Sequence, residues 1–197
     1  GGKASFVSAL PANPLGDACI AFLRSLDIDT SSIIRTENGR LGLYFLETGA
    51  NQRASNVIYD RENSAIAVTP SSAYEWDRIF DGASWFHISG ITPALSKNAA
   101  DSSLNAVRKA KERNLTVSCD LNFRKKLWKW DKNMKPRELA EKTMREILPY
   151  TDLVIANEED ASDVLGIHAE GSDASSGKLD TSRYPEVAEK ISAQFPN

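Results

Sequence analysis

Three polar residues that could bind a ligand follow one apolar stretch of the sequence. Asp120, Asn122 and Arg124 stand at alternating positions just after the apolar residues 115–117. In an open sheet of parallel strands, ligands bind outside the carboxyl ends of the strands. If the strand continued, the three side chains would share one face and could bind a polar or anionic ligand, because arginine holds a carboxylate or phosphate bidentately. The alternative is a solvated strand end whose side chains cap nearby loops.

A second group of candidates combines two tyrosines with an arginine. Tyr44, Tyr59 and Arg61 lie on a predicted hairpin, where Tyr59 and Arg61 are two residues apart and so lie on one face. Phenol hydroxyls could bind the hydroxyls of a sugar acid while the guanidinium binds its carboxylate. Ordinary cross-strand packing, in which tyrosine is common, is the alternative that the spacing alone favours.

A third candidate lies where a predicted helix begins directly after a strand. Asn157 and Asp160 are three residues apart and so share one face of that helix. They could hold Mg²⁺ through water, because Mg²⁺ prefers a few carboxylates together with water ligands. The alternative is helix capping, since Asn is a favoured N-cap and acidic residues in the first turn complement the helix dipole.

One further pair, His87 and Ser89, stands at alternating positions of an apolar strand. An acid–base pair is conceivable, but the sequence has no Gly-x-Ser-x-Gly elbow, and a hydrogen-bonded core histidine is the better interpretation.

Alternating strand and helix patterns predict the elements that position these residues. The resulting βαβ units favour an α/β fold with a largely parallel sheet. The expected strands are residues 4–10, 85–89, 115–120 and 152–156. The expected helices are residues 14–26, 73–80, 97–114, 136–147, 157–166 and 187–195, with 168–182 as a loop.

Residues 36–68 interrupt this pattern. Residues 41–47 and 54–60 read as two strands that are joined by a polar loop containing Gly49, and residues 65–68 read as a third strand. We therefore expect a small β lid over residues 36–68, set apart from an α/β core formed by residues 1–35 and 69–197. The glycine pair before the first strand and the final helix without a following strand further suggest that the core is incomplete at both ends.

Composition excludes several classes of protein. The chain has 197 residues, 41% of them hydrophobic, and a net charge of −3, so a nucleic acid is a poor candidate for a partner. No apolar run approaches the roughly 20 residues that cross a bilayer, and no signal-peptide pattern begins the sequence, so we expect no membrane association. Cys19 and Cys119 are isolated, which predicts reduced thiols, a cytoplasmic location and no zinc site.

Taken together, these segments resemble the ribokinase-like (PfkB) carbohydrate kinases, and most closely the 2-keto-3-deoxygluconate kinases. The resemblance covers residues 1 to about 167 in the order of the family. Its most specific parts are the Asp-x-Asn-x-Arg…Leu-Trp motif at 120–128 and the Asn-x-x-acid motif at 157–160. The other matching segments are Phe-Val-Ser-Ala-Leu (6–10), Asn-Pro-Leu-Gly-Asp (13–17), Gly-Leu-Tyr (42–44), Tyr-Asp-Arg (59–61), Ser-Ala (64–65) and His-Ile-Ser-Gly-Ile (87–91).

The resemblance implies a three-layer α/β/α domain with a mainly parallel sheet, a small β lid over the sugar, and a homodimer formed through the lids. It implies ATP and Mg²⁺ as cosubstrates and transfer of the γ-phosphoryl group to a hydroxyl of a sugar acid, with 2-keto-3-deoxygluconate as the expected acceptor. The Tyr-x-Arg element of the lid is what favours this acid over fructose or ribose.

Site residues follow from the resemblance position by position. The implied sugar contacts are Tyr44, Tyr59, Arg61, Ile91 and Arg124. Arg124 would lie between the sugar acid and the phosphates, above a floor that is shaped by Asp120 and Asn122. Asn157 and Asp160 would lie near magnesium and phosphate, without a direct metal ligand.

The sequence departs from the family pattern at three points. Asp160 stands where Glu is frequent, which shortens the reach of the carboxylate by one methylene, and Asp60 stands where an aromatic residue is common. The Gly-Ala-Gly-Asp motif, which carries the catalytic base of the family, is absent and would be expected beyond Asn197. We therefore assign no catalytic residue here and expect the 197-residue segment alone to be inactive.

Several alternatives stay open. The protein could be a fructokinase or another sugar kinase of the same family. It could also be a non-catalytic module that dimerises through the hairpin. A Rossmann dehydrogenase is disfavoured because no Gly-x-Gly-x-x-Gly fingerprint is present.

Overall fold

A parallel three-stranded sheet forms the centre of the molecule. In the computed structural model, which describes residues 2–167 and 184–196, this sheet has the order β7 (Trp85–Ser89), β8 (Thr116–Asp120) and β9 (Leu153–Ile155). The predicted loop 168–182 lies outside the described residues. Ser89, Asp120 and Ile155 are register partners, so the three strands end side by side. This shared carboxyl edge is where the first group of candidate residues was expected.

Helices follow the strands in the predicted alternation. They are α5 (Lys97–Glu112), α6 (Pro136–Ile147), α7 (Glu158–Leu165) and α8 (Tyr184–Gln194). Ser96 caps α5 by accepting a hydrogen bond from the backbone N–H of Ala99, and Gly166 ends α7 in the left-handed conformation, as their sequences predict. The main core lies between the sheet and these helices and includes Val117, Cys119 and Trp128. No helix in the described ranges is both long and apolar enough to cross a membrane.

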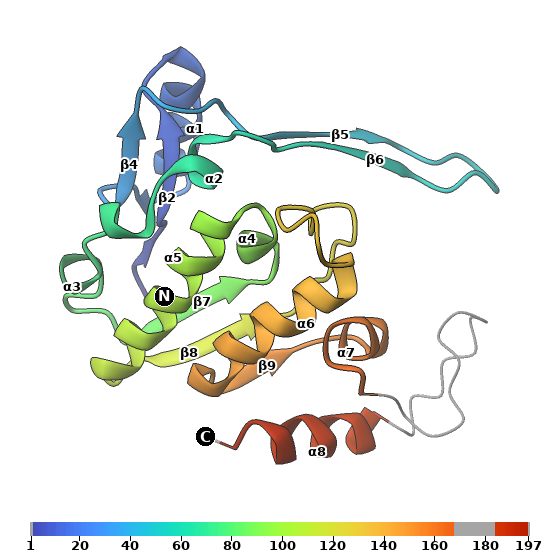
Figure 1. Ribbon diagram of the computed structural model, residues 1–197. Helices are drawn as coiled ribbons and strands as arrows, with labels where there is room; N and C mark the ends of the chain where they lie inside the picture. The colour runs from blue at the N-terminus through green and yellow to red at the C-terminus, as the bar shows by residue number, and fades with distance from the viewer. Residues whose placement is uncertain (1, 168–183, 197) are drawn as a thin grey trace.

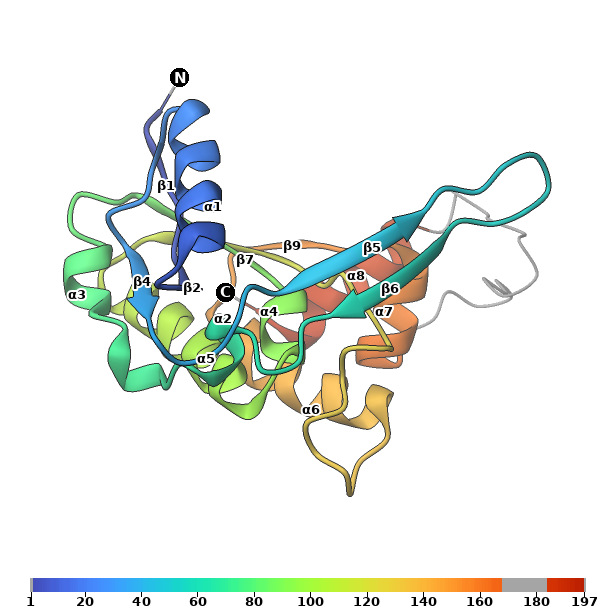
Figure 2. The ribbon, with the colours of Figure 1, turned by 90° about the horizontal axis from the view of Figure 1, so that it is seen from above.

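The first 36 residues form two short parallel strand pairs around one helix. Strand β1 (Ala4–Ser5) pairs with β3 (Ile28–Asp29), and β2 (Ser8–Pro11) pairs with β4 (Ile33–Thr36). The single strand predicted for residues 4–10 is therefore wrong, because its two halves have different partners. Helix α1 (Pro14–Ser25) begins after Asn13, a favoured N-cap residue whose side chain accepts hydrogen bonds from two backbone N–H groups. Figure 2 shows α1 on the opposite side of the strands from α5.

The apolar stripe of α1 is exposed. Leu15, Phe22 and Leu26 are each more than half exposed, and Gly16 is the one buried residue of this helix. These residues recur at helical spacing, and no described segment covers them.

The predicted lid is an antiparallel hairpin of β5 (Leu43–Glu47) and β6 (Asn56–Asp60). It projects from the body of the molecule as a long ribbon (Figure 1). The third lid strand predicted for residues 65–68 is wrong: this stretch is the one-turn helix α2 (Ala65–Val68), which packs against β2 and α5. A four-residue apolar run does not distinguish a strand from a buried helical turn. The backbone at Gly39 approaches α2 so closely that a Cβ there would lie 2.7 Å from the Cα of Ala65.

Four shorter helical turns complete the described elements. The helix predicted for residues 73–80 is split into η1 (Ser71–Ala73) and α3 (Trp76–Ile79). The turns α4 (Ile91–Ala94) and η2 (Leu148–Tyr150) follow β7 and α6.

Candidate functional site

The end of β7 is hydrogen-bonded to the end of β8 at the shared carboxyl edge. The Gly90 N–H donates to the carbonyl oxygen of Asp120 across 2.8 Å. A Cβ on Gly90 would lie 2.1 Å from the Leu121 oxygen, so only glycine permits this approach. Ile91 then begins α4 directly beyond the junction. The expected sugar-site residue Ile91 and the expected floor residue Asp120 therefore stand at the same edge of the sheet.

The alternation of Asp120, Asn122 and Arg124 does not continue as a strand. Strand β8 ends at Asp120, and Asn122 has a φ of +38°, so the three side chains do not follow the pleat of one strand face. The Asn122 Nδ2 instead donates to Ser89 Oγ across 3.3 Å and links the loop to the end of β7. Arg124 is exposed, with its Nη1 donating to the Phe123 oxygen across 3.0 Å. Its guanidinium remains accessible to an anion.

The Asn157–Asp160 pair supports the loop that carries Arg124. The Asn157 side chain caps α7 by accepting from the Asp160 N–H at 2.7 Å. The Asp160 Oδ1 accepts from the Phe123 N–H at 2.9 Å and so fixes the backbone beside Arg124. Burial raises the pKa of the Asp160 carboxyl, although the Phe123 N–H and the Arg124 charge oppose that shift. The structure therefore brings together two groups of residues that the sequence placed far apart.

These residues fit a magnesium ion only in a water-mediated arrangement. One Asp160 oxygen and the Asn157 side-chain oxygen are already engaged by backbone N–H groups. Within the described ranges, no group of three or more His, Cys, Asp or Glu side chains could hold a metal ion. Mg²⁺ commonly keeps several waters and binds through one or two carboxylates and substrate phosphates, which is compatible with this donor set.

The tyrosine–arginine group of the lid is assembled as the sequence suggested. Tyr44 and Tyr59 are register partners across the hairpin. The Arg61 guanidinium carbon lies 5.8 Å from the ring centroid of each tyrosine, within cation–π range. The Arg61 Nε is buried and has no hydrogen-bond partner among the described residues. The group is therefore held by ring stacking and backbone position, which fits both the binding and the packing interpretations.

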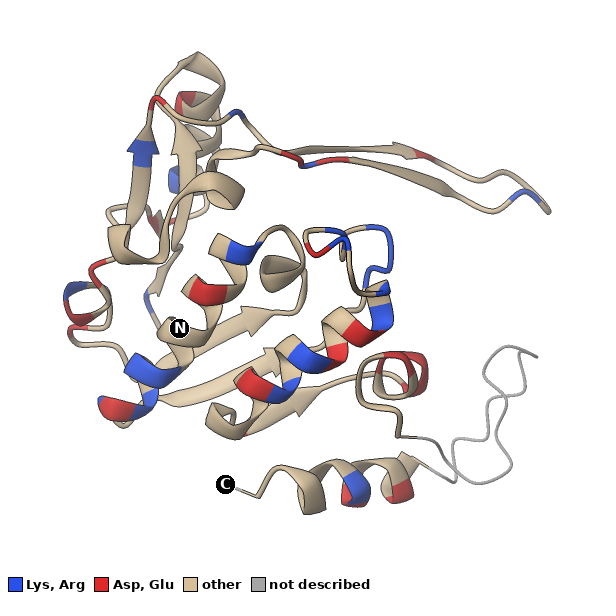
Figure 3. Ribbon diagram, viewed as in Figure 1, with Lys and Arg blue, Asp and Glu red and all other residues tan. Residues whose placement is uncertain are grey.

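A cavity and a hydrogen bond connect the lid with the loop after β8. Lys126 Nζ donates to the carbonyl oxygen of Val57 on β6 across 3.3 Å. Beside this contact lies a cavity of about 290 Å³, whose lining includes Tyr59, Arg61, Lys129 and Trp130. Figure 3 shows lysine and arginine gathered on the loop between β8 and α6. The base of the hairpin and this loop therefore form a positively charged surface that suits anionic ligands.

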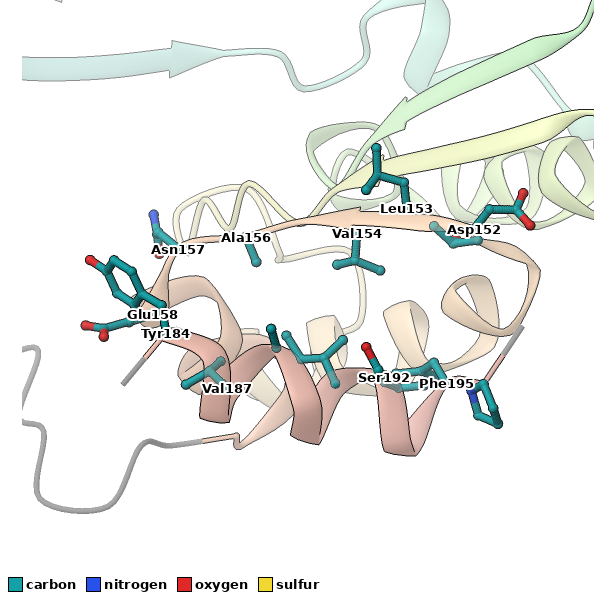
Figure 4. Close-up of a pocket in the computed structure, with 14 residues that line it drawn as sticks. Asp152, Leu153, Val154, Ala156, Asn157, Glu158, Tyr184, Val187, Ser192 and Phe195 are labelled. Atoms are coloured by element: carbon teal, nitrogen blue, oxygen red, sulfur yellow. The ribbon is translucent and has the colours of Figure 1, made fainter. Parts of the chain in front are cut away.

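A larger cavity of about 810 Å³ lies between β9 and α8 (Figure 4). Asn157 and Glu158 stand at one end of it, and apolar residues such as Val154 and Val187 form much of the rest. The Glu158 carboxylate is buried, and its oxygens have no hydrogen-bond partner in the part of the chain that is described. The sequence indicated only a first-turn helix carboxylate at this position.

Sequence reasoning missed the residues that position the candidates. Ser89 Oγ accepts hydrogen bonds from Asn122 Nδ2 and from the Ile91 N–H, each at 3.3 Å. No role was predicted from the sequence for Arg40, which pairs with Asp60. His87 is hydrogen-bonded as expected, with Nδ1 2.8 Å from Ser118 Oγ, but it is exposed and not in the core. The signals for Ser89 in the sequence were its alternation with His87 and its place in the matching segment 87–91, and neither indicated a positioning role.

Comparisons with known proteins identify the family and the fold of the chain. The pfkB family of carbohydrate kinases matches residues 1–183. A 2-dehydro-3-deoxygalactonokinase of Haloferax volcanii is 33% identical over 165 residues, which are 84% of this chain and 49% of the relative. The crystal structure of 2-dehydro-3-deoxygluconokinase from Thermotoga maritima is 43% identical, with a TM-score of 0.88, and the match covers 100% of this chain and 56% of that one.

A more distant structure shares the fold alone. It is a ribokinase II structure from E. coli in complex with ATP and Mg²⁺, which is 18% identical with a TM-score of 0.74, over 98% of this chain and 54% of that one. The chain thus spans about half the length of the relatives it matches. These matches confirm the ribokinase-like α/β fold class, and the chain belongs to the pfkB family of carbohydrate kinases.

Proposed function

We propose that the protein is an ATP-dependent kinase that transfers the γ-phosphoryl group to a hydroxyl of a 2-keto-3-deoxy sugar acid. The observation that carries the proposal is the group of Arg61 with Tyr44 and Tyr59 on the lid. An arginine that stacks on two phenol rings offers its N–H edge to a carboxylate, while the phenol hydroxyls can bind sugar hydroxyls. The Haloferax volcanii relative and the Thermotoga maritima structure are both named as kinases of such acids, which supports the same substrate class.

The opposite wall of the proposed sugar site is the carboxyl edge of the sheet. Ile91 would line it, Asp120 and Asn122 would form its floor, and Arg124 would contact both the sugar acid and the transferred phosphate. Phosphoryl transfer depends mainly on positioning and on neutralising the phosphate charge. The exposed guanidinium of Arg124, next to the Asp160-anchored backbone of Phe123, suits that task.

ATP and Mg²⁺ are the proposed cosubstrates. Asn157 and Asp160 would hold Mg²⁺ through water near the phosphates, where the ion would neutralise charge on the transferred group. The shared fold of the E. coli structure that holds both ligands supports this choice. No described residue is assigned as the proton acceptor, and the sequence holds no Gly-Ala-Gly-Asp motif.

The hairpin is also the proposed dimer contact. Successive residues of a strand point to opposite faces, so Phe45 and its register partner Ile58 lie on the face opposite Tyr44 and Tyr59. Phe45 and Ile58 are both more than half exposed. We propose that two copies of the protein bury this apolar face against each other. The proposed location is the cytoplasm, where Cys19 and Cys119, both free thiols, would stay reduced.

A kinase assay of the full-length parent protein with four sugars tests the substrate proposal, since the 197-residue segment alone is expected to be inactive. 2-Keto-3-deoxygluconate should be phosphorylated in preference to fructose and ribose, and its C4 epimer, the galactonate-type acid, should rank above both uncharged sugars. Arg61→Ala should remove most of this preference, because it removes the carboxylate ligand. Arg53→Ala is the matched control, since Arg53 lies near the tip of the same hairpin and pairs with Glu47. A preference for fructose that Arg61→Ala leaves unchanged would favour the fructokinase alternative.

Titration with ATP and with the sugar acid separates a kinase from a non-catalytic module. The proposal predicts that the protein binds the sugar acid. A stable dimer that binds neither ligand would instead favour a dimerising module.

A further inference from the structure

We propose that the ion pair of Arg40 and Asp60 is a positioning device that holds the sugar-facing group of the lid in place. The inference rests on the proposed function, because it concerns the residues that are proposed to contact the sugar acid. In this proposal the two residues act through the backbone that carries Tyr59 and Arg61, and not by contact with the ligand.

The pair has a bidentate geometry. Arg40 Nη1 donates to Asp60 Oδ2 across 3.0 Å, and Nη2 makes a second, shorter contact with Oδ1. The same Nη1 also donates to the Leu41 oxygen at 3.2 Å, which fixes the guanidinium beside the incoming strand. Two parallel N–H···O bonds define orientation as well as distance, so this pair can control the direction of the chain.

The location of Asp60 makes that control relevant to the site. Asp60 lies between Tyr59 and Arg61, and it pairs with Leu43 at the last rung of the hairpin ladder. Because neighbouring side chains in a strand alternate, Asp60 points to the face opposite Tyr59. The ion pair therefore holds the chain on one face of the hairpin, while the side chains of Tyr59 and Arg61 meet on the opposite face.

The backbone of Arg40 is in turn hydrogen-bonded to the segment that leads into α2. Its N–H donates to the Asn63 oxygen at 3.2 Å, and its carbonyl oxygen accepts from the Ala65 N–H at 2.8 Å. Ser64 and Ala65 are almost completely buried at the start of α2. The guanidinium thus links the exposed hairpin with a buried anchor, through a contact between residues that are 20 positions apart.

The orientation of the Arg61 side chain depends on the backbone that the ion pair holds. Its Nε has no hydrogen-bond partner in the described part of the chain, so its direction depends on the two tyrosine rings and on the backbone at residue 61. Both members of the ion pair are close to half exposed, and such pairs add little to global stability. We therefore expect the loss of the pair to reduce ligand affinity much more than stability.

Binding of 2-keto-3-deoxygluconate to matched variants tests the inference. Arg40→Ala and the near-isosteric Asp60→Asn should each weaken the affinity by about fivefold to tenfold, because small displacements of ligand-binding groups are costly. ATP affinity and the urea midpoint of unfolding should stay close to those of the wild type. The exchanged double variant, Arg40→Asp with Asp60→Arg, should recover part of the lost affinity.

The second ion pair of the hairpin provides the control. Glu47 and Arg53 pair near the tip, where both side chains are more than half exposed. Glu47→Gln should leave the affinity within about twofold of the wild type, because the tip pair does not touch the backbone at Tyr59 or Arg61.

The possible results separate the inference from the proposed function. Wild-type affinity in both Arg40→Ala and Asp60→Asn, or equal losses in Glu47→Gln, would overturn the inference and leave the proposed function standing. A lower urea midpoint that accounts for the whole loss of affinity would assign the pair a structural role and also overturn the inference. A wild-type protein that binds no sugar acid would contradict both.

Discussion

The carboxyl end of β8 and the β5–β6 hairpin both supply candidate ligand residues, but they are held in very different ways. Val117, Cys119 and Leu121 around the end of β8 are completely or almost completely buried in the main core. Tyr44, Phe45 and Ile58 of the hairpin are all more than half exposed. One region is positioned by close packing, the other by a hydrogen-bonded ladder and a few polar contacts at its base. Substitutions should therefore cost mainly stability in the first region and mainly ligand binding in the second.

The largest loss of stability is expected at Trp128, which follows the β8 loop and is 1% exposed. Trp128→Ala should lower the free energy of unfolding by about 3–5 kcal/mol, because it removes a large buried side chain and leaves a cavity. Urea denaturation measures the effect. Trp128→Phe is the control and should cost much less, since the Trp128 Nε1 has no hydrogen-bond partner in the described residues. Equal stability of Trp128→Ala and the wild type would contradict the assigned core.

An intermediate effect is expected at Asp160. Asp160→Ala leaves the buried Phe123 N–H without its acceptor and should cost about 1–3 kcal/mol of unfolding free energy. Asp160→Asn keeps a side-chain oxygen and should cost less. If Asp160 serves the site only by positioning, Asp160→Asn should also retain the sugar affinity. An altered Mg²⁺ dependence in Asp160→Asn would show that the carboxylate charge also acts on the metal.

The pH dependence of stability provides a smaller, independent test of the same carboxyl. Its pKa is raised by burial above the usual 3.8, so the folded protein retains this proton more tightly than the unfolded chain does. The resulting stabilisation is complete below pH 3.8 and is lost as the pH rises through the raised pKa. The unfolding free energy of the wild type relative to Asp160→Asn should therefore fall with rising pH in that window. A difference that rises with pH would indicate a lowered pKa instead.

The smallest effect on stability is expected at Phe45 on the exposed face of the hairpin. Phe45→Ala should change the unfolding free energy of the monomer by less than about 0.5 kcal/mol, because the ring is already 56% exposed. The same substitution should weaken the proposed dimer. Light scattering over a range of protein concentrations measures the second effect, and a destabilised monomer with an unchanged dimer would contradict the assignment of this face.

Local signals were sufficient to predict much of the fold. Asn13 and Ser96 were recognisable as caps because their side chains suit the first N–H groups of a helix. Buried helical turns and single residues with special backbone angles were not recognisable in this way. The run 65–68 forms helix α2, which packs on β2 and α5. The alternation of residues 120, 122 and 124 suggested a continued strand, but the positive φ of Asn122 turns the chain into a loop there.

The sequence indicates single candidate residues of the site, but not the contacts that hold them in place. Tyr59 and Arg61 are near neighbours in sequence, so their shared position followed from strand geometry. The contacts that fix them join distant positions: Arg40 with Asp60 and Lys126 with Val57, the latter 69 residues apart. No periodicity or short motif indicates such pairs, because they depend on how the hairpin is placed on the core.

The central claim is that Arg61, between Tyr44 and Tyr59, binds the carboxylate of a sugar acid. Calorimetric titration of the wild type and Arg61→Ala with 2-keto-3-deoxygluconate and with uncharged fructose tests it most directly. We predict that the wild type binds the acid more tightly, and that Arg61→Ala loses about tenfold or more of the affinity for the acid but little for fructose, because a charge-assisted bond is removed. Equal losses for both sugars, or no loss for the acid, would contradict the claim.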